Sequence, residues 1–301
     1  MGLIDTATRG ILPKSQIIVI YGPNGVGKTT LATAFSQSLI ADLEDGSNHI
    51  TNTTRISSNK LTTYDDLLLL IEEVKKSTFK TFVVDSLESL ETLIQTKIKK
   101  DNKVESIEDI PYGKGMVYTR EEFERFMRLM HQLRDDNGMD VILVGHSVTK
   151  AYTDPNANVT YDRQVLRTND KVASIVKDLS DCILYITYKV DTVSQKNKDK
   201  VKAYGDGERI IYTQWRPGFD AKSRYPIAFE IPFNLDVTPI TEIVELLKPK
   251  SPEDLAQTCR DLLMRITDEM RRKEIAAKMD KVIDNPTQLE KFKNKLLELV
   301  K

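Results

Sequence analysis

Residues 22–29 read Gly22-Pro23-Asn24-Gly25-Val26-Gly27-Lys28-Thr29, and this stretch decides the fold class. A glycine, four free positions, then Gly-Lys and a Ser or Thr form the phosphate-loop pattern. The β-branched run directly before it, at 16–21, is typical of a parallel strand buried on both faces. The segment directly after it, at 29–39, carries Ala, Leu and Phe at helical spacing. The pattern therefore lies between a strand and a helix, as a nucleotide-binding loop requires.

A turn of this kind binds phosphate because its backbone N–H groups face the phosphate oxygens at the positive end of the following helix. Lys28 would reach the β- and γ-phosphates, and the Thr29 hydroxyl would bind Mg²⁺. A chance match is the alternative, and the correct flanks on both sides disfavour it. We therefore expect ATP and Mg²⁺ as ligands. The expected nucleotide-binding residues are Gly22, Pro23, Asn24, Gly25, Val26, Gly27, Lys28, Thr29 and Thr30.

The composition limits the remaining functions. With 44 basic and 45 acidic residues the net charge is −1, so nucleic-acid contacts must come from local patches. Cys182 and Cys259 are far apart in the sequence and are expected to be reduced packing residues. The three histidines have no cysteine at ligand spacing, which disfavours a zinc site. No signal-peptide pattern and no apolar run near ~18 residues is present, so we expect a cytoplasmic protein without a membrane partner.

Strands and helices alternate along most of the chain. This order predicts an α/β fold with a mostly parallel central sheet and a ligand site at the carboxyl ends of its strands. A late β-hairpin is expected where the turn at 204–207 leads into 209–215. We expect an ATPase domain over residues 1–248 and a small helical segment over 249–301. The glycine-rich stretch at 111–115 and the polar stretch at 148–169 are expected to be loops.

Two carboxylates follow predicted strands. Asp85 ends an apolar strand, where the second motif of phosphate-loop enzymes places an acid that holds Mg²⁺ opposite Thr29. Its alternative role is the N-cap of the next helix. Glu44 ends the strand after the phosphate-loop helix and is the candidate for orienting the water that attacks ATP. The alternative is a solvated acid in a turn.

Three further residues are candidates for sensing or stabilising the γ-phosphate. His146 ends the strand at 141–145 and can donate a hydrogen bond to the γ-phosphate, although a structural role is also open. Lys222 and Arg224 are separated by one residue, so both can point the same way from an extended segment. Facing a neighbouring subunit, they would act as an arginine finger does; a solvated basic loop is the alternative.

Together these motifs resemble the RecA-like ATPase core. The resemblance rests on residues 22–29, Asp42-Leu43-Glu44, Val83-Val84-Asp85-Ser86 and Val144-Gly145-His146-Ser147, and it extends over residues 15–247. In that family the glutamate that ends the second strand is catalytic, and a polar sensor ends the strand before the second DNA-binding loop. The resemblance implies these roles for Glu44 and His146.

The chain is also similar to phage ATPases of the Sak-four group, compact RecA-like recombinases that cooperate with single-strand-binding protein. The shared elements are Tyr-Gly-Lys-Gly at 112–115, Glu-Glu-Phe at 121–123 and Asp-Ala-Lys-Ser-Arg-Tyr at 220–225. The last element is similar to the Lys-Asn-Arg motif of RadA and its relative in DnaB-type helicases, which acts between subunits. Ser223 and Pro226 depart from the usual Asn and Gly.

The resemblance implies a homo-oligomeric ring or filament that binds single-stranded DNA and a single-strand-binding protein. It implies an ATP-dependent recombinase or annealing protein, with DNA contacts from Lys114, Lys150, Arg163 and Arg167. A DnaB-like helicase or loader, a small-molecule or nucleotide kinase, and a non-catalytic nucleotide-switched scaffold are the alternatives.

Overall fold

The computed structural model describes residues 14–194, 201–225, 227–233, 240–248, 252–266, 268–283 and 285–300. By its internal contacts the chain divides into two compact units. The larger unit comprises residues 15–224 and 229–246, and it contains the phosphate loop. The smaller unit comprises residues 1–14, 225–228 and 247–301.

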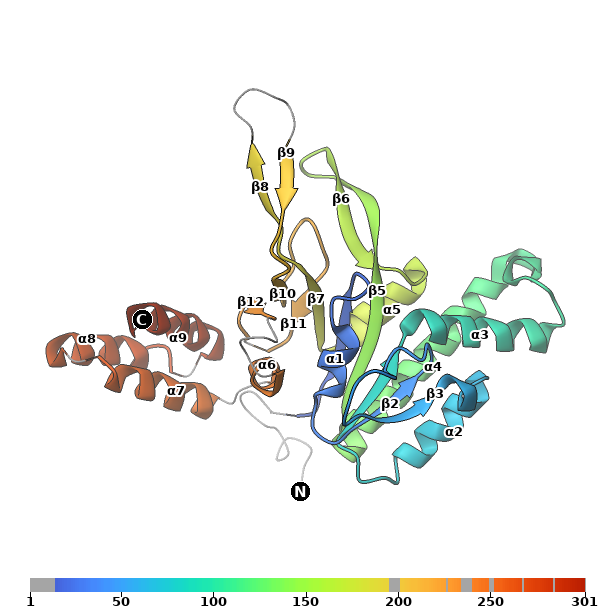
Figure 1. The fold of residues 1–301 in the computed structure, drawn as a ribbon, viewed down its shortest axis with the longest axis horizontal. Coiled ribbons are helices and arrows are strands. Elements are labelled where there is room, and N and C mark those ends of the chain that lie inside the picture. Colours follow the sequence, from blue (N-terminus) through green and yellow to red (C-terminus); the bar gives the residue numbers. More distant parts are fainter. Residues whose placement is uncertain are drawn as a thin grey trace, which may run out of the picture. The chain divides into compact units, whose positions relative to one another are not determined.

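The larger unit is built on a central, mostly parallel sheet, which confirms the predicted fold class (Figure 1). The parallel strands pair in the order β7-β1-β5-β4-β2-β3, and two antiparallel strands, β10 and β12, follow β7. Their bounds are β1 Ile17–Gly22, β2 Ser38–Asp42, β3 Thr54–Ser57, β4 Thr81–Asp85, β5 Asp140–Asp154, β7 Cys182–Tyr188, β10 Arg209–Tyr212 and β12 Glu230–Pro232.

One apolar cluster joins a face of this sheet to four helices. Ile17, Val19 and Tyr21 of β1 contribute alternate side chains to it, as expected for a strand. Thr63 and Asp66 form a capping box at the start of α2, and Ser86 caps α3. The helices are α2 Tyr64–Val74, α3 Leu87–Asn102, α4 Lys114–Asn137 and α5 Asp170–Leu179.

The register of the parallel strands brings the motif residues to one edge of the sheet. Gly22 at the end of β1 is opposite His146 in β5. Asp85 at the end of β4 is opposite Asp42 in β2 and Val144 in β5. Because these strands run in parallel, their carboxyl ends meet where the phosphate loop begins.

Two segments predicted as loops are regular structure. Strand β5 does not stop at Gly145 but continues to Asp154 and forms a long antiparallel hairpin with β6, Val159–Leu166 (Figure 1). The loop predicted at 111–115 is a 3₁₀ turn, Pro111–Gly113, followed directly by α4. The phosphate-loop helix α1, Lys28–Thr33, is shorter than its helical pattern suggested.

The late hairpin has other partners than those predicted. Strand β9, Val201–Tyr204, pairs with β8, Asp191–Ser194. Strand β10 instead pairs with β7, so residues 204–207 connect two different sheets. A two-residue strand, β11 Lys222–Ser223, also pairs with β7, at its first residues.

The predicted helical segment near the C-terminus is present within the smaller unit. Its helices α7 Pro252–Met264, α8 Glu269–Asp280 and α9 Pro286–Val300 pack around an apolar cluster that includes Leu255, Cys259 and Leu289. Helix α6, Ile240–Leu247, precedes them. In the described part of the chain, every helix is too short or too polar to span a bilayer.

Candidate functional site

The phosphate loop connects β1 to α1 and lines a cleft of about 370 Å³. Gly25 and Gly27 have φ values of 75° and 99°, in the left-handed region that glycine tolerates. A Cβ atom at Gly27 would lie 2.9 Å from Cε1 of Phe233. The glycines therefore allow both the backbone conformation and the close packing of the loop.

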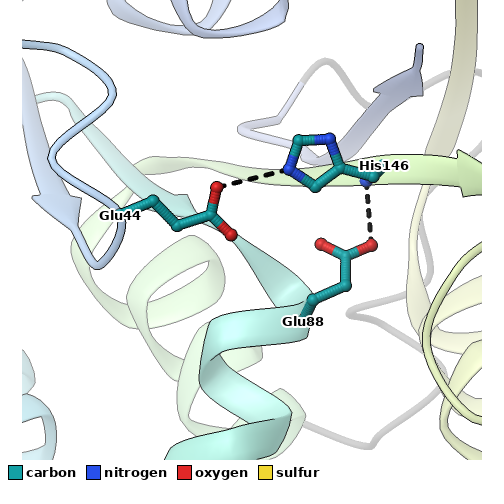
Figure 2. Close-up of side chains that lie close together, drawn as sticks. All are labelled: Glu44, Glu88 and His146. Atoms are coloured by element: carbon teal, nitrogen blue, oxygen red, sulfur yellow. Dashed lines mark hydrogen bonds and ion pairs between the residues drawn. The ribbon is translucent and has the colours of Figure 1, made fainter. Parts of the chain in front are cut away.

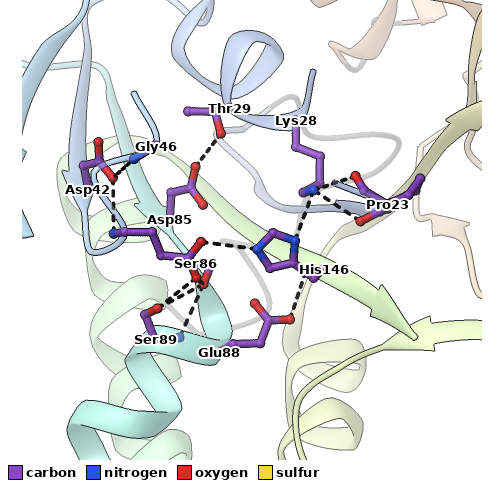
Figure 3. A network of polar contacts seen from close by, with 12 residues as sticks. Pro23, Lys28, Thr29, Asp42, Gly46, Asp85, Ser86, Glu88, Ser89 and His146 are labelled. Carbon is purple, nitrogen blue, oxygen red and sulfur yellow. Dashed lines mark hydrogen bonds and ion pairs between the residues drawn. The ribbon is translucent and has the colours of Figure 1, made fainter. Parts of the chain in front are cut away.

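Lys28 projects from the start of α1 into the core of the loop (Figure 3). Its ammonium group donates to the carbonyl oxygens of Gly22, at 3.2 Å, and Pro23, at 2.9 Å. Burial lowers the pKa of Lys28, and the carboxylates of Asp85, Glu88 and Glu44 oppose this effect. Its two direct hydrogen-bond partners are neutral carbonyls, and a phosphate oxygen can replace them with a stronger, charge-assisted hydrogen bond.

Thr29 and Asp85 face each other across the same cleft. The Thr29 hydroxyl donates to Oδ2 of Asp85 at 2.6 Å (Figure 3). Burial raises the pKa of Asp85 to about 6, against the stabilising bond from Thr29. A hydroxyl and a carboxylate are hard oxygen donors, so this pair fits Mg²⁺. The N-cap of α3 is Ser86, which leaves the Asp85 carboxylate for this contact.

Glu44 is presented by a turn that Asp42 holds in place. The buried Asp42 carboxylate accepts hydrogen bonds from the backbone N–H groups of Glu44, Gly46 and Ser47, at 3.3, 3.0 and 2.8 Å. Ser47 also donates its hydroxyl, at 2.5 Å. Of the acids in this turn, Asp42 is therefore structural, and Glu44 faces the cleft.

The Glu44 carboxylate is held by donors from the start of α3 and from β5. The hydroxyls of Ser86 and Ser89 donate to its Oε1, the latter at 2.9 Å. His146 Nε2 lies 3.3 Å from its Oε2. The His146 hydrogen bond, followed by those from Ser86 and Ser89, lowers the pKa of Glu44 to about 2. Glu44 is thus a weak base that stays charged, which suits orienting a water molecule better than deprotonating it.

His146 connects Lys28 to Glu44. Its Nδ1 lies 3.4 Å from the Lys28 ammonium, and its backbone N–H donates to Oε1 of Glu88 at 2.9 Å (Figure 2). The ligand atoms of Glu44, Glu88 and His146 all lie within 4.8 Å of one another. The structure therefore brings Lys28, Thr29, Glu44, Asp85 and His146 to one site, as the strand-end argument predicted.

Three residues that sequence reasoning missed also lie at this site. The Tyr188 hydroxyl donates to the carbonyl of Gly25 at 3.1 Å. The Arg209 guanidinium lies 5.8 Å from the centre of the Tyr188 ring and lines the cleft. Tyr188 belongs to β7 and Arg209 to β10, and no local sequence pattern indicates that these two strands pair. Glu88 was missed as well, although its position three residues after Asp85 could have indicated it.

Comparison with known families agrees with this geometry. Residues 14–225 match the AAA domain family. The chain belongs to that family. A comparison with curated proteins gave no match. As an AAA domain the protein is a P-loop nucleoside triphosphatase, and ATP with Mg²⁺ is the ligand pair expected of such a site.

The AAA domain holds Lys222 and Arg224 away from its own phosphate loop. Both lie beside the first residues of β7, at the amino ends of the parallel strands, whereas Gly22 lies at their carboxyl ends. Arg224 pairs with the buried Asp181 at 3.0 Å, and Lys222 donates to the carbonyl of Lys177. Burial, followed by the charge of Arg224, lowers the pKa of Lys222.

The predicted DNA-contacting cations lie in three places. Lys150 and Arg163 belong to the β5–β6 hairpin and pair with Asp170 and Asp220, both at 2.5 Å. Arg167 directly follows β6, is exposed, and donates its backbone N–H to the carbonyl of His146 at 3.0 Å. Lys114 is the first residue of α4, with its ammonium 5.9 Å from the centre of the Tyr112 ring.

We expect Asp85→Asn to stabilise the metal-free AAA domain while removing its ATPase activity. The native pKa of about 6 exceeds the ordinary value of 3.8, so the native state holds a proton that the unfolded state has released. The free energy of unfolding therefore falls as pH rises from 3.8 to 6, by up to about 3 kcal/mol. Asn avoids this cost because it carries no charge to bury, and its carbonyl oxygen can still accept the Thr29 hydrogen bond.

Urea unfolding at pH 5 and pH 8, without Mg²⁺ or nucleotide, checks this expectation. The variant should be the more stable protein at pH 8, and the difference should shrink at pH 5. Asp42→Asn is the matched control and should destabilise at both pH values, because its carboxylate accepts hydrogen bonds only. An equal effect of Asp85→Asn at both pH values would contradict the expectation.

Proposed function

We propose that this protein is an ATP-dependent, single-stranded-DNA-binding protein of the recombinase or annealing type, with ATP hydrolysed between subunits. One observation carries the proposal. The strand that bears His146 at the nucleotide site continues without interruption, as β5, into the β5–β6 hairpin (Figure 1). A single continuous strand therefore links the site that would sense the γ-phosphate to a hairpin that projects from the sheet.

Within the site, each side chain has a role that its contacts support. Lys28 exchanges its carbonyl partners for phosphate oxygens. Thr29 and Asp85 hold Mg²⁺, which when bound offsets the charge of the phosphates. Glu44 orients the attacking water toward the γ-phosphate, and its three donors keep the carboxylate in place.

His146 is the proposed sensor. It lies between Lys28 and Glu44, so both of its ring nitrogens face groups that would surround the γ-phosphate. Loss of this phosphate would change the balance of those contacts, and β5 would carry the change toward the hairpin. ATP binding would thereby favour one arrangement of the DNA-binding surface, and hydrolysis would release it.

Lys222 and Arg224 are proposed to act on the nucleotide of a neighbouring subunit. They lie at the edge of the sheet opposite to their own phosphate loop, and Arg224 is about half exposed, at 54%. In a ring or filament, this end of one subunit's sheet would lie against the phosphate loop of the next subunit, and these cations would then reach the neighbouring γ-phosphate. We also propose that residues 1–248 form the ATPase domain, that 249–301 form a separate helical segment, and that a single-strand-binding protein is a partner.

The proposal is tested by measuring steady-state ATP turnover with and without single-stranded oligo(dT). We expect severalfold stimulation by the oligonucleotide and none by a blunt duplex of equal length. A strand-separation assay on a forked duplex should remain negative, whereas a helicase would unwind it. Turnover that is indifferent to DNA would overturn the DNA-binding function and leave an ATPase of another kind.

A further inference from the structure

The two faces of the β5–β6 hairpin differ in chemistry. On one face Lys150 pairs across the strands with Arg163, and Tyr152 pairs with Tyr161, with ring centroids 5.5 Å apart. The opposite face carries the pairs Thr149 with Gln164, Ala151 with Asp162, and Thr153 with Thr160. The aromatic rings and the cations of the hairpin stem are therefore gathered on a single face. Asp162 lies on the opposite face, and Asp154 lies at the turn end of the aromatic face, where it accepts hydrogen bonds from the backbone of its own turn.

A third aromatic ring joins this face from a distant segment. The Arg163 guanidinium lies 5.5 Å from the centre of the Tyr152 ring and 5.2 Å from that of Trp215. It is thus shared by two aromatic rings that remain accessible, with Tyr152 38% and Trp215 53% exposed. Both rings therefore combine a contact with the Arg163 cation and a surface that is open to solvent.

Arg163 holds these rings and is not free to bind phosphate. Its Nη2 pairs with Oδ1 of Asp220 at 2.5 Å, and both side chains are mostly buried. The second oxygen of Asp220 pairs with Lys177 at 2.7 Å. The charge of Arg163 is therefore neutralised within the protein, and its guanidinium is fixed. Rings preorganised in this way lose little conformational freedom when a ligand stacks on them.

The same cluster is tied to the strand that delivers the phosphate loop. The hydroxyl of Tyr21, the residue before Gly22, donates to the carbonyl of Asp220 at 2.6 Å and accepts from its N–H at 3.0 Å. It also lies 3.2 Å from the carbonyl of Gln164 in β6. Tyr21 thereby connects β1 to both segments that position Arg163.

We propose that the rings of Tyr152 and Trp215, positioned by Arg163, form a stacking surface for the bases of a single nucleic-acid strand. Aromatic rings bind bases of any sequence through their faces, which suits a recombinase or annealing protein. Lys150, on the same face, would contact the backbone phosphates, since its exposed ion pair with Asp170 is readily exchanged. This inference rests on the proposed function and names the surface that would carry it out.

Trp215 is the only tryptophan of the chain, so its fluorescence reports on this surface alone. Wild-type protein is titrated with oligo(dT), with oligo(U), and with an abasic oligonucleotide that has phosphates but no bases. We expect oligo(dT) and oligo(U) both to quench Trp215, since stacking uses the faces of the bases, and the abasic strand to bind weakly without quenching. Equal binding of the abasic strand would overturn base stacking.

Substitutions test separately the exposed ring of Tyr152 and the guanidinium of Arg163 that positions it. Tyr152→Leu removes an exposed ring but keeps apolar volume, and it should weaken oligo(dT) binding about 5- to 100-fold. Arg163→Lys keeps the charge but loses the planar guanidinium that contacts both rings, and it should weaken oligo(dT) binding to a similar degree. Thr160→Ala, on the opposite face, is the matched control and should bind as wild type does.

The results distinguish failure of this inference from failure of the proposed function. If oligo(dT) stimulates ATP turnover but leaves Trp215 fluorescence and the Tyr152→Leu affinity unchanged, DNA binds elsewhere and only the stacking surface is wrong. If no oligonucleotide binds or stimulates turnover, the DNA-binding function itself is wrong. Quenching of Trp215 by oligo(dT), together with weaker oligo(dT) binding by Tyr152→Leu, supports both the stacking surface and the DNA-binding function.

Discussion

Replacement of Arg224 by Ala is expected to lower ATP turnover about 10³-fold or more while leaving the fold intact. The magnitude is that of an arginine finger, which stabilises charge on the transferred phosphoryl group. The fold should survive because Asp181, the partner of Arg224, keeps its bonds to Arg134 at 2.8 Å and to the N–H of Ile17 at 2.9 Å. Steady-state turnover with oligo(dT) measures the loss.

Mixing two inactive chains tests whether Arg224 acts between subunits. The Arg224→Ala chain retains its phosphate loop, and a Lys28→Ala chain retains its arginine. Where the intact arginine faces the intact loop, activity should return, so the mixture should exceed both single variants. Arg120→Ala is a matched control, since Arg120 is similarly exposed, at 55%, and pairs with Glu124 of its own helix. Absence of recovery between folded, co-assembled chains would place Arg224 within its own subunit.

Replacement of Glu44 by Gln is expected to lower kcat about 10²- to 10⁴-fold while ATP affinity changes little. The carboxylate has a pKa of about 2 and is therefore charged under all working conditions. Gln keeps the shape and can still accept a hydrogen bond from Ser86 or Ser89, but it loses the charge that orients water toward the γ-phosphate. Pre-steady-state hydrolysis and equilibrium nucleotide binding measure the two quantities separately.

Glu88→Gln provides a matched control for Glu44→Gln. Its Oε1 accepts the His146 backbone N–H, and its Oε2 is buried without a hydrogen-bond partner among the described residues. Gln can preserve the first contact, so turnover should fall far less than in Glu44→Gln. If Glu44→Gln retained full turnover, Glu44 would not orient the attacking water. A nucleotide-switched scaffold would then become the better interpretation of the protein.

Several features follow from local sequence alone. The phosphate loop between an apolar strand and a helix predicts nucleotide binding, because few other segments require glycine, lysine and threonine at this spacing. The buried runs of β1, β4 and β5 predict a parallel sheet, and parallel strands necessarily bring Asp85 and His146 to one edge. These inferences hold because the apolar runs of the strands and the residue types of the phosphate loop are each set by residues that are close in sequence.

The β5–β6 hairpin was missed because its pattern is not local. Both faces of the hairpin are partly polar, with Lys150 and Tyr152 on one and Thr149 and Thr153 on the other. Alternation between apolar and polar residues, the usual strand signal, is therefore absent. Partners far along the chain position it instead, among them Asp220 and Trp215, which contact Arg163.

The fold class, the phosphate loop and the strand-end acids can be predicted from the sequence, since they depend on residue type and short-range spacing. The separate roles of Asp42, which supports the turn, and Glu44, which faces the cleft, become visible in the folded chain, because the two carboxylates differ in the donors that surround them. The tertiary structure likewise brought Arg209 to the phosphate loop and placed Arg224 at the opposite edge of the sheet. Such placements depend on how strands distant in sequence pair, which no short segment specifies.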